Sequence, residues 1–336
     1  MKRCGSEFLW ITRRGFMGFN TAARVFIIAL AAALAGVACA QTYPNKPIRM
    51  VTSSAGGSAD FAARLIAQGL TGELGQQVVV DNRGGSVSTS VGIVAKAPPD
   101  GYTLLLYASS LWIAPLLQPV SYDPIRDFSP ITLAASSPYI LVVHPTVPVT
   151  SVKELIALAK AKPGELNYAS SGLGTANHLA AELFNAMAGV SIVHVPYKGA
   201  GPALNALIGG QLQVMFPSAG SVTSHIKSGR LKALGVTSAE PSALAPGLPT
   251  VASAGVPGYE SLLMIGVFTP AGVPAALINR LHQEIVKALR KADTKERLFN
   301  AGVEAVGGTP AQLAASVKSE MVRLGKVIKD AGIRAE

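Results

Sequence analysis

The sequence predicts an α/β protein built from two domains. Its 336 residues exceed the ~100–200 residues that a single domain usually occupies. Short β-rich runs alternate with helical patterns, and this alternation favours parallel sheets covered by helices. The expected strands are residues 48–51, 78–81, 103–107, 140–143, 192–195, 214–216 and 233–236. The expected helices between them include residues 62–70, 152–161 and 179–187.

Two longer amphipathic helices are expected in the C-terminal third of the chain. Residues 275–290 place Leu277, Leu281 and Ile285 on one face, and residues 311–329 repeat the pattern. Apolar residues spaced by three and four positions form a single stripe along a helix. Such stripes indicate helices that pack on a domain core.

The composition indicates a folded protein, because 49% of the residues are hydrophobic and only 14% are charged. The formal net charge is +10, but the first forty residues hold five basic residues and one acidic residue, and so carry +4 of it. The remaining positive charge is spread along the chain, without a basic run interleaved with aromatic residues. We therefore expect no nucleic-acid partner.

The N-terminus has the three parts of an export signal. A basic region precedes an apolar stretch at residues 25–37, and Ala38 and Ala40 frame a cleavage site. The apolar stretch is shorter than the ~20 residues of a membrane-spanning helix. We therefore expect residues 1–40 to be an export signal, cleaved after Ala40, and the mature protein to be periplasmic.

Two details of this segment bear on export and on redox chemistry. The pair Arg13-Arg14 resembles a twin-arginine signal, which exports folded proteins. Lipid attachment at Cys39 is the alternative to simple cleavage. Cys4 and Cys39 are the only cysteines, and both precede the expected cut. The mature chain therefore offers no disulfide, cysteine-based metal site or cysteine nucleophile.

No sequence motif of a known catalytic class is present. The chain lacks a G-x-S-x-G nucleophile elbow, a Walker A loop, a G-x-G-x-x-G fingerprint and an H-E-x-x-H zinc motif. Its histidines, at positions 144, 178, 194, 225 and 282, show no metal-ligand spacing. We expect a protein that is not an enzyme and that uses neither a metal nor a cofactor.

Four segments share the design of a strand followed by a Gly- and Ser-rich loop and then a helix. Glycine lets the backbone approach a ligand, and the free N–H groups at a helix N-terminus favour an anion. These loops therefore suit a carboxylate or a phosphate, and His178 lies three residues into one of the helices. The candidate ligand-binding residues are Ser53, Ser54, Ala55, Gly56, Gly57, Ser109, Ser170, Ser171, Gly172, Gly174, Thr175, His178, Tyr197, Lys198 and Ser218.

The order of segments along the mature chain resembles one known family, the periplasmic substrate-binding receptors of tripartite tricarboxylate transporters, or Bug-type receptors. Each matching segment is modest, but their order is specific. They are Tyr43–Arg49, the Gly56-Gly57 loop with Asp60 and Arg64, Ala95–Leu105, Gly174–Leu179, Val195–Gly199, Leu248–Val251 and Pro270–Pro274.

The resemblance implies a type II periplasmic-binding-protein fold, in which two α/β lobes joined by two crossover strands close on a ligand in the cleft between them. It implies a first lobe made of residues 41–142 and 266–336 and a second lobe of residues 143–265, with crossovers near Val143 and Gly266. Family members bind small carboxylates and deliver them to membrane permease subunits. Carried onto this chain, the resemblance implies that Ser53–Gly57 and Ser170–Thr175 bind the carboxylate. It also implies that the receptor is a monomer.

The sequence leaves three functions open. The resemblance favours a receptor for a small organic anion, such as a mono- or dicarboxylate. The same closure of two lobes on a ligand would serve a receptor that signals to a membrane sensor kinase. The sequence does not separate transport from sensing. A secreted hydrolase using a serine with His178 or His194 is the third, and the missing nucleophile elbow argues against it.

Overall fold

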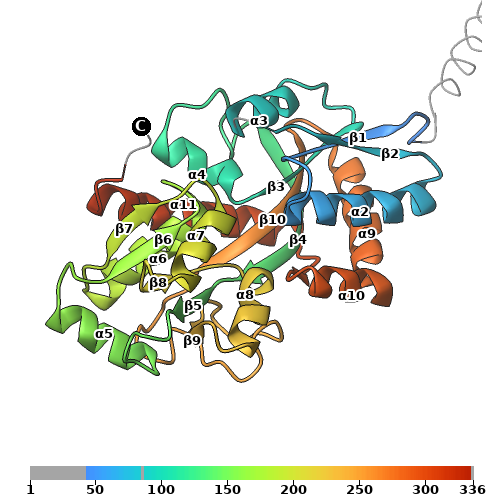
Figure 1. Ribbon diagram of the computed structural model, residues 1–336. Helices are drawn as coiled ribbons and strands as arrows, with labels where there is room; N and C mark the ends of the chain where they lie inside the picture. The colour runs from blue at the N-terminus through green and yellow to red at the C-terminus, as the bar shows by residue number, and fades with distance from the viewer. Residues whose placement is uncertain (1–42, 85–86, 334–336) are drawn as a thin grey trace, which may run out of the picture. The chain divides into compact units, whose positions relative to one another are not determined.

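The computed structural model describes residues 43–84 and 87–333, of which residues 46–333 belong to one compact unit (Figure 1). The expected export signal and both cysteines lie outside the described residues. The strands are β1 (Ile48–Thr52), β2 (Val78–Asn82), β3 (Thr103–Ala108), β4 (Phe128–Pro138), β5 (Ile140–Val143), β6 (Asn167–Ser170), β7 (Val193–Pro196), β8 (Val214–Met215), β9 (Lys232–Val236), β10 (Leu262–Pro270) and β11 (Glu304–Ala305). The helices are α2 (Ser58–Leu74), α3 (Val87–Ala95), α4 (Ser110–Leu117), α5 (Val152–Ala161), α6 (Ala176–Ala188), α7 (Ala200–Ile208), α8 (Ala219–Lys227), α9 (Ala275–Arg290), α10 (Ala292–Asn300) and α11 (Pro310–Asp330).

The strands form two sheets, and each sheet with its helices is a lobe. The first sheet has the order β11-β4-β10-β3-β1-β2, and the second has the order β7-β6-β8-β5-β9. The expectation of parallel sheets is only partly correct, because β10 runs antiparallel to β3 and β4, and β5 runs antiparallel to β8 and β9. These antiparallel strands are those that follow a passage between lobes, where no crossover helix restores the strand direction.

The chain changes sheet at two places. It passes from β4 to β5 at Tyr139, and it returns through β10, whose Leu262 pairs with Pro138 of β4. The sequence-based boundaries at Val143 and Gly266 lie a few residues further along. At the first passage the backbone stays extended from β4 through Tyr139 into β5, so no turn residue marks the point at which the chain changes sheet.

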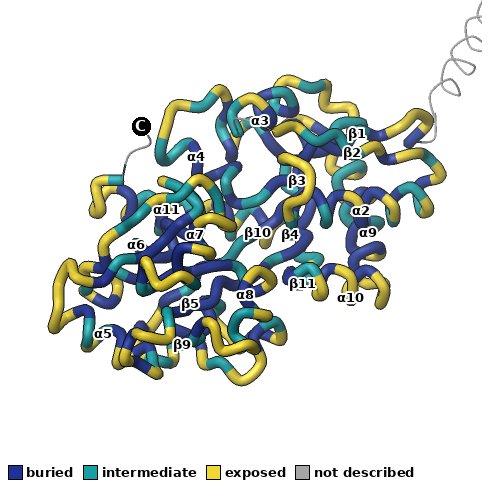
Figure 2. The backbone as a smooth tube through the Cα atoms, viewed as in Figure 1, coloured by how far each residue is buried: buried dark blue, intermediate teal, exposed yellow. Residues whose placement is uncertain are grey.

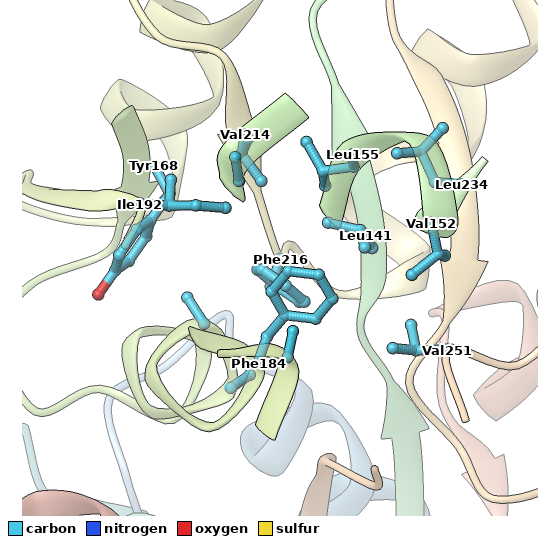
Figure 3. Close-up of a cluster of buried hydrophobic side chains, with 14 of the residues drawn as sticks. Leu141, Val152, Leu155, Tyr168, Phe184, Ile192, Val214, Phe216, Leu234 and Val251 are labelled. Atoms are coloured by element: carbon cyan, nitrogen blue, oxygen red, sulfur yellow. The ribbon is translucent and has the colours of Figure 1, made fainter. Parts of the chain in front are cut away.

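The core of the second lobe follows from the sequence of β5. Ile140–Val143 is a continuous apolar run, as expected for a central strand buried on both faces. Leu141 and Val143 point into one cluster with α5 and α6, whereas Ile140 and Val142 point into another with α7 and α8. Figure 3 shows Phe184 and Phe216 within the first cluster, and Figure 2 shows β5 in the dark blue of buried residues.

The C-terminal helices pack on the first lobe. Helix α9 lies against α2, and α11 packs on β4 and α4 (Figure 1). Leu313, Val317 and Leu324 of α11 enter the core that holds Trp112. The expected helix at residues 275–290 is confirmed with the same bounds, and the one at 311–329 differs by one residue at each end. Within the described ranges, no helix combines the length and apolar character needed to cross a membrane.

Candidate functional site

A pocket of about 200 Å³ lies where the second lobe meets the two passages between lobes. It is bounded by the first residues of three helices and by side chains at both passages. The lining residues are Tyr139, Ser171, Thr175, Ala176, Asn177, Ala200, Leu204, Met215, Pro217, Ser218, Ser221 and Leu263.

The pocket receives the N-termini of α6, α7 and α8. Ala176 begins α6, Ala200 begins α7, and Ser218 is the N-cap of α8. None of these three helices has a side chain capping its first turn. The first N–H groups of a helix have no partner within it, and the helix dipole adds positive potential there. The convergence of three such ends favours an anion, although no lysine or arginine is among the lining residues.

The Ser170–Thr175 loop is held in shape by its own glycines and hydroxyls. Gly172 and Gly174 have φ values of +140° and +72°, which residues other than glycine rarely adopt. The Ser171 hydroxyl donates to Oδ1 of Asn177 at 2.7 Å. Thr175 Oγ1 lies 2.7 Å from both the Gly172 carbonyl and Asn177 Oδ1, and its single proton serves one of them at a time.

A stack of aromatic rings lies beneath this loop. The His178 and His194 rings are 3.9 Å apart, and Tyr168 stacks on His194 at 4.9 Å. His178 Nδ1 accepts the backbone N–H of Gly174 at 2.9 Å, and His194 Nε2 lies 2.6 Å from Ser170 Oγ. Burial lowers the pKa of His178 to about 3 and that of His194 to about 4, so both rings are neutral near pH 7.

The sequence-predicted loop of the first lobe, Ser53–Gly57, does not line this pocket. It is mostly exposed and joins β1 to α2. Asp60 accepts the Gly56 N–H at 2.9 Å, and Asn82 donates to the same carboxylate at 2.8 Å. Burial acts to raise the pKa of Asp60, but the bonds from Gly56, Asn82 and Arg64 outweigh it and leave the pKa below its usual value. Asp60 thus fixes the loop, as expected of a residue in the first turn of a helix.

The remaining sequence-predicted residues take different places. Ser171, Thr175 and Ser218 line the pocket, whereas Ser170 and His178 are buried under the loop. Ser109 follows β3 and is buried, and its hydroxyl has no hydrogen-bond partner among the described residues.

The connection between β7 and α7 lies against the same loop. The Tyr197 N–H donates to the Ser170 carbonyl at 3.1 Å, and the Gly199 N–H donates to the Ser171 carbonyl at 3.0 Å. The side chain of Lys198 is exposed and does not line the pocket.

Sequence reasoning missed the pocket residues at the passages between lobes and one polar residue of α6. Tyr139 and Leu263 reach the pocket because β4 ends and β10 begins beside it. No local pattern announces such a position. Asn177 carried a signal, because it lies in the second position of the helix that follows a Gly-rich loop, and its amide collects the hydroxyls of that loop.

The lobes touch at more than one point. A Cβ built on Gly174 would lie 2.5 Å from Cδ1 of Leu117, at the end of α4 in the first lobe. At a second contact, the Ser242 hydroxyl of the second lobe lies 2.7 Å from Oε1 of Glu304 in β11. Within residues 43–84 and 87–333, no cluster of three or more metal-ligating side chains is found.

The two-lobe α/β fold with an anion-favouring pocket defines a solute-binding protein, and comparisons with known proteins give its family. Residues 62–333 match the model of the tripartite tricarboxylate transporter family receptor. The chain is 40% identical to the protein of the tcbD-tcbE intergenic region of Pseudomonas sp. strain P51, over 90% of this chain and 94% of that protein. It is 36% identical to BugT of Bordetella pertussis, over 92% and 97% of the two chains. The chain therefore belongs to the tripartite tricarboxylate transporter receptor family, as the resemblance indicated.

Solved structures support the same fold. R. palustris Rpa4515, determined with adipate, is 36% identical, with a TM-score of 0.74 over 87% of this chain and 99% of that chain. MatC of Rhodopseudomonas palustris, determined with malate, is 29% identical, with a TM-score of 0.69 over 85% of this chain and all 100% of that chain.

Proposed function

We propose that the protein is an extracytoplasmic receptor that binds a small organic carboxylate and delivers it to a tripartite tricarboxylate-type permease. The observation that carries the proposal is the meeting of the α6, α7 and α8 N-termini at one pocket. The adipate and malate in the two Rhodopseudomonas structures support a carboxylate rather than a phosphate.

The chemistry of the pocket suits a carboxylate of a few carbons. Burying a carboxylate without partners would cost several kcal/mol, so its oxygens need donors. Free N–H groups at the starts of α6, α7 and α8 supply them, while Leu204, Met215 and Leu263 offer apolar surface for the carbon chain. The volume of about 200 Å³ is below the ~300–1,000 Å³ of pockets for drug-sized ligands.

The first lobe completes the site when the lobes close. We assign this role to the Ser53–Gly57 loop, whose N–H groups precede α2, and to Ser109, whose buried hydroxyl lies just after β3. Closure is a two-state change, and a ligand drives it by binding the closed state more tightly than the open one. Lys198 and Tyr197 border the site from the β7–α7 connection.

Export fits this role. We propose that residues 1–40 are removed on export and that the mature receptor is a monomer in the periplasm. Its partners are then the membrane permease subunits. A sensor-kinase partner would use the same closure, and binding of the closed receptor to one membrane protein or the other separates the two functions.

One observation supports the alternative of a hydrolase, and another argues against it. Ser170 Oγ lies 2.6 Å from His194 Nε2, the distance at which a base activates a hydroxyl nucleophile. However, Ser170 is fully buried, and its hydroxyl also lies 3.0 Å from the Gly172 carbonyl, to which it can donate. A nucleophile must reach its substrate, so we assign this pair to structure. Hydrolysis of simple esters by the protein, lost in Ser170→Ala, would reverse that assignment.

The test of the proposed function is thermal unfolding against carboxylates, amino acids, sugars and phosphate esters. A ligand at about 100 times its Kd adds roughly 2.7 kcal/mol to the free energy of unfolding, which raises the Tm by several degrees. We expect shifts only with one group of carboxylates. A shift with sugars or phosphate esters alone would contradict the proposal.

A further inference from the structure

The two stacked histidines occupy the space between β6, β7 and α6. Tyr168 of β6 lies directly opposite His194 of β7 in the parallel register, which brings their rings together. His178 comes from the first turn of α6 and completes the stack at 3.9 Å from His194. His178 is 2% exposed and is not among the residues that line the pocket.

Each histidine is bonded to the ligand loop through a different ring nitrogen. His178 uses Nδ1, which accepts the Gly174 N–H at 2.9 Å and must therefore be unprotonated. His194 uses Nε2, which lies 2.6 Å from Ser170 Oγ. Ser170 Oγ in turn accepts the Gly172 N–H at 3.1 Å. The two rings thus fix both glycines of the loop.

This arrangement also directs the backbone donors. The Gly174 and Gly172 N–H groups are used inside the loop, so the pocket receives the N–H groups that begin α6 instead. We infer that His178 and His194 are positioning residues, which act through Gly174 and Ser170 to hold the Ser170–Thr175 loop in the shape that binds the carboxylate. This inference rests on the proposed function for its ligand, but the hydrogen bonds that it invokes exist without one.

The titratable groups around the stack are few. His178 and His194 face each other, Tyr168 lies beside both rings, 4.9 Å from that of His194 and 6.2 Å from that of His178, and Glu182 of α6 accepts the Tyr168 hydroxyl. The lowered pKa values of both histidines, caused first by burial, agree with their role as neutral partners. The loop is therefore expected to keep one shape from about pH 5 to pH 8.

The different ring nitrogens give a matched set of variants. Asparagine places its amide oxygen near the position of Nδ1, whereas glutamine reaches the position of Nε2. His178→Asn should therefore keep an acceptor for Gly174, and His178→Gln should not. The preference should reverse at the other site, where His194→Gln keeps a partner for Ser170 and His194→Asn does not.

The experiment measures the Kd for adipate and for malate by calorimetry, together with amide exchange at Gly172 and Gly174 by NMR. We expect His178→Gln to bind about five- to tenfold more weakly than His178→Asn, since a hydrogen bond contributes about 1 kcal/mol, and His194→Asn to bind more weakly than His194→Gln by a similar factor. Exchange at Gly174 should be faster in His178→Gln than in His178→Asn. Equal affinities within each pair, or an equal rate of exchange at Gly174, would overturn the inference.

Failure of the proposed function would look different. If the unmodified protein binds no carboxylate, the ligand assignment is wrong, and the exchange measurement alone still decides whether the histidines hold the loop. If all four variants are equally weakened while remaining folded, the rings act only by packing and the inference is wrong.

Discussion

Gly302 meets Gly220 backbone to backbone, across the boundary between the lobes. A Cβ built on Gly302 would lie 2.4 Å from the Cα of Gly220, and one built on Gly220 would lie 2.9 Å from the Cα of Gly302. Gly220 is in the first turn of α8, between pocket residues Ser218 and Ser221, whereas Gly302 follows α10 in the first lobe. Only glycine allows this backbone contact, so a larger residue at either position should change how the two lobes pack against each other.

Replacing Gly220 with alanine should weaken ligand binding without unfolding the protein. The added methyl group meets backbone that cannot move aside, and overpacking of this kind costs about 1–3 kcal/mol. This free-energy cost destabilises the arrangement in which the two lobes are in contact. Because the ligand binds between the lobes, the affinity for a carboxylate should drop about tenfold. Gly72→Ala is the control, because Gly72 lies in α2 with no atom within 4 Å of an added Cβ. Equal affinities of the two variants would argue against lobe contact as a part of binding.

Gly174 should be the most sensitive position of the ligand loop. Its φ of +72° disfavours any side chain, and an added Cβ would lie 2.5 Å from Leu117 Cδ1. Gly174→Val should therefore abolish carboxylate binding in a protein that stays folded. Gly174→Ala should lose less, and Leu117→Ala added to it should restore part of the affinity, measured by calorimetry. No gain from the second change would show that backbone strain acts alone.

The buried histidines should make stability depend on pH in one window. Their pKa values are about 3 for His178 and about 4 for His194, against about 6.5 in an unfolded chain. Below pH 6.5 the unfolded chain therefore binds more protons, and stability falls as the pH falls toward 4. Thermal unfolding should show a shallower fall in His194→Gln than in the unmodified protein. Parallel curves would mean that His194 is not buried in the neutral form.

Glu320 should make the stability of the protein depend on pH in the opposite direction. It is buried in α11, where it accepts the Trp112 Nε1–H at 2.5 Å, and burial raises its pKa to about 7. The protonated form is thus favoured in the folded protein, and its stability contribution is lost as the pH rises from about 4.5 through 7. Glu320→Gln should raise the Tm at pH 8 and leave it nearly unchanged at pH 4.5. The reverse pattern would contradict a raised pKa.

The sequence predicts those parts of the fold that local pattern determines. The apolar run Ile140–Val143 is a strand because both of its faces are buried, and β5 has the expected bounds. By contrast, β4 was missed, since Phe128–Pro138 contains serines and prolines and becomes a strand through its pairing with β10, more than a hundred residues away. Strand pairing at long range leaves no local trace in the sequence.

The same distinction holds for the site. Ser171, Thr175 and Ser218 were predicted because loop composition and helix starts are local features. Tyr139 enters through a passage between lobes. The contact of His194 with Tyr168 depends on the register of β6 and β7. Such features depend on how distant segments pair, so only the folded structure reveals them.

The most direct test of the proposed binding site is calorimetric titration of adipate and malate into the purified protein and into its Asn177→Leu variant. Asn177 lies at the start of α6, lines the pocket and holds the loop hydroxyls. We expect one or both dicarboxylates to bind one site per chain, and the variant to stay folded but to lose at least tenfold in affinity. Tight binding that is indifferent to Asn177 would place the carboxylate elsewhere and contradict the proposed site.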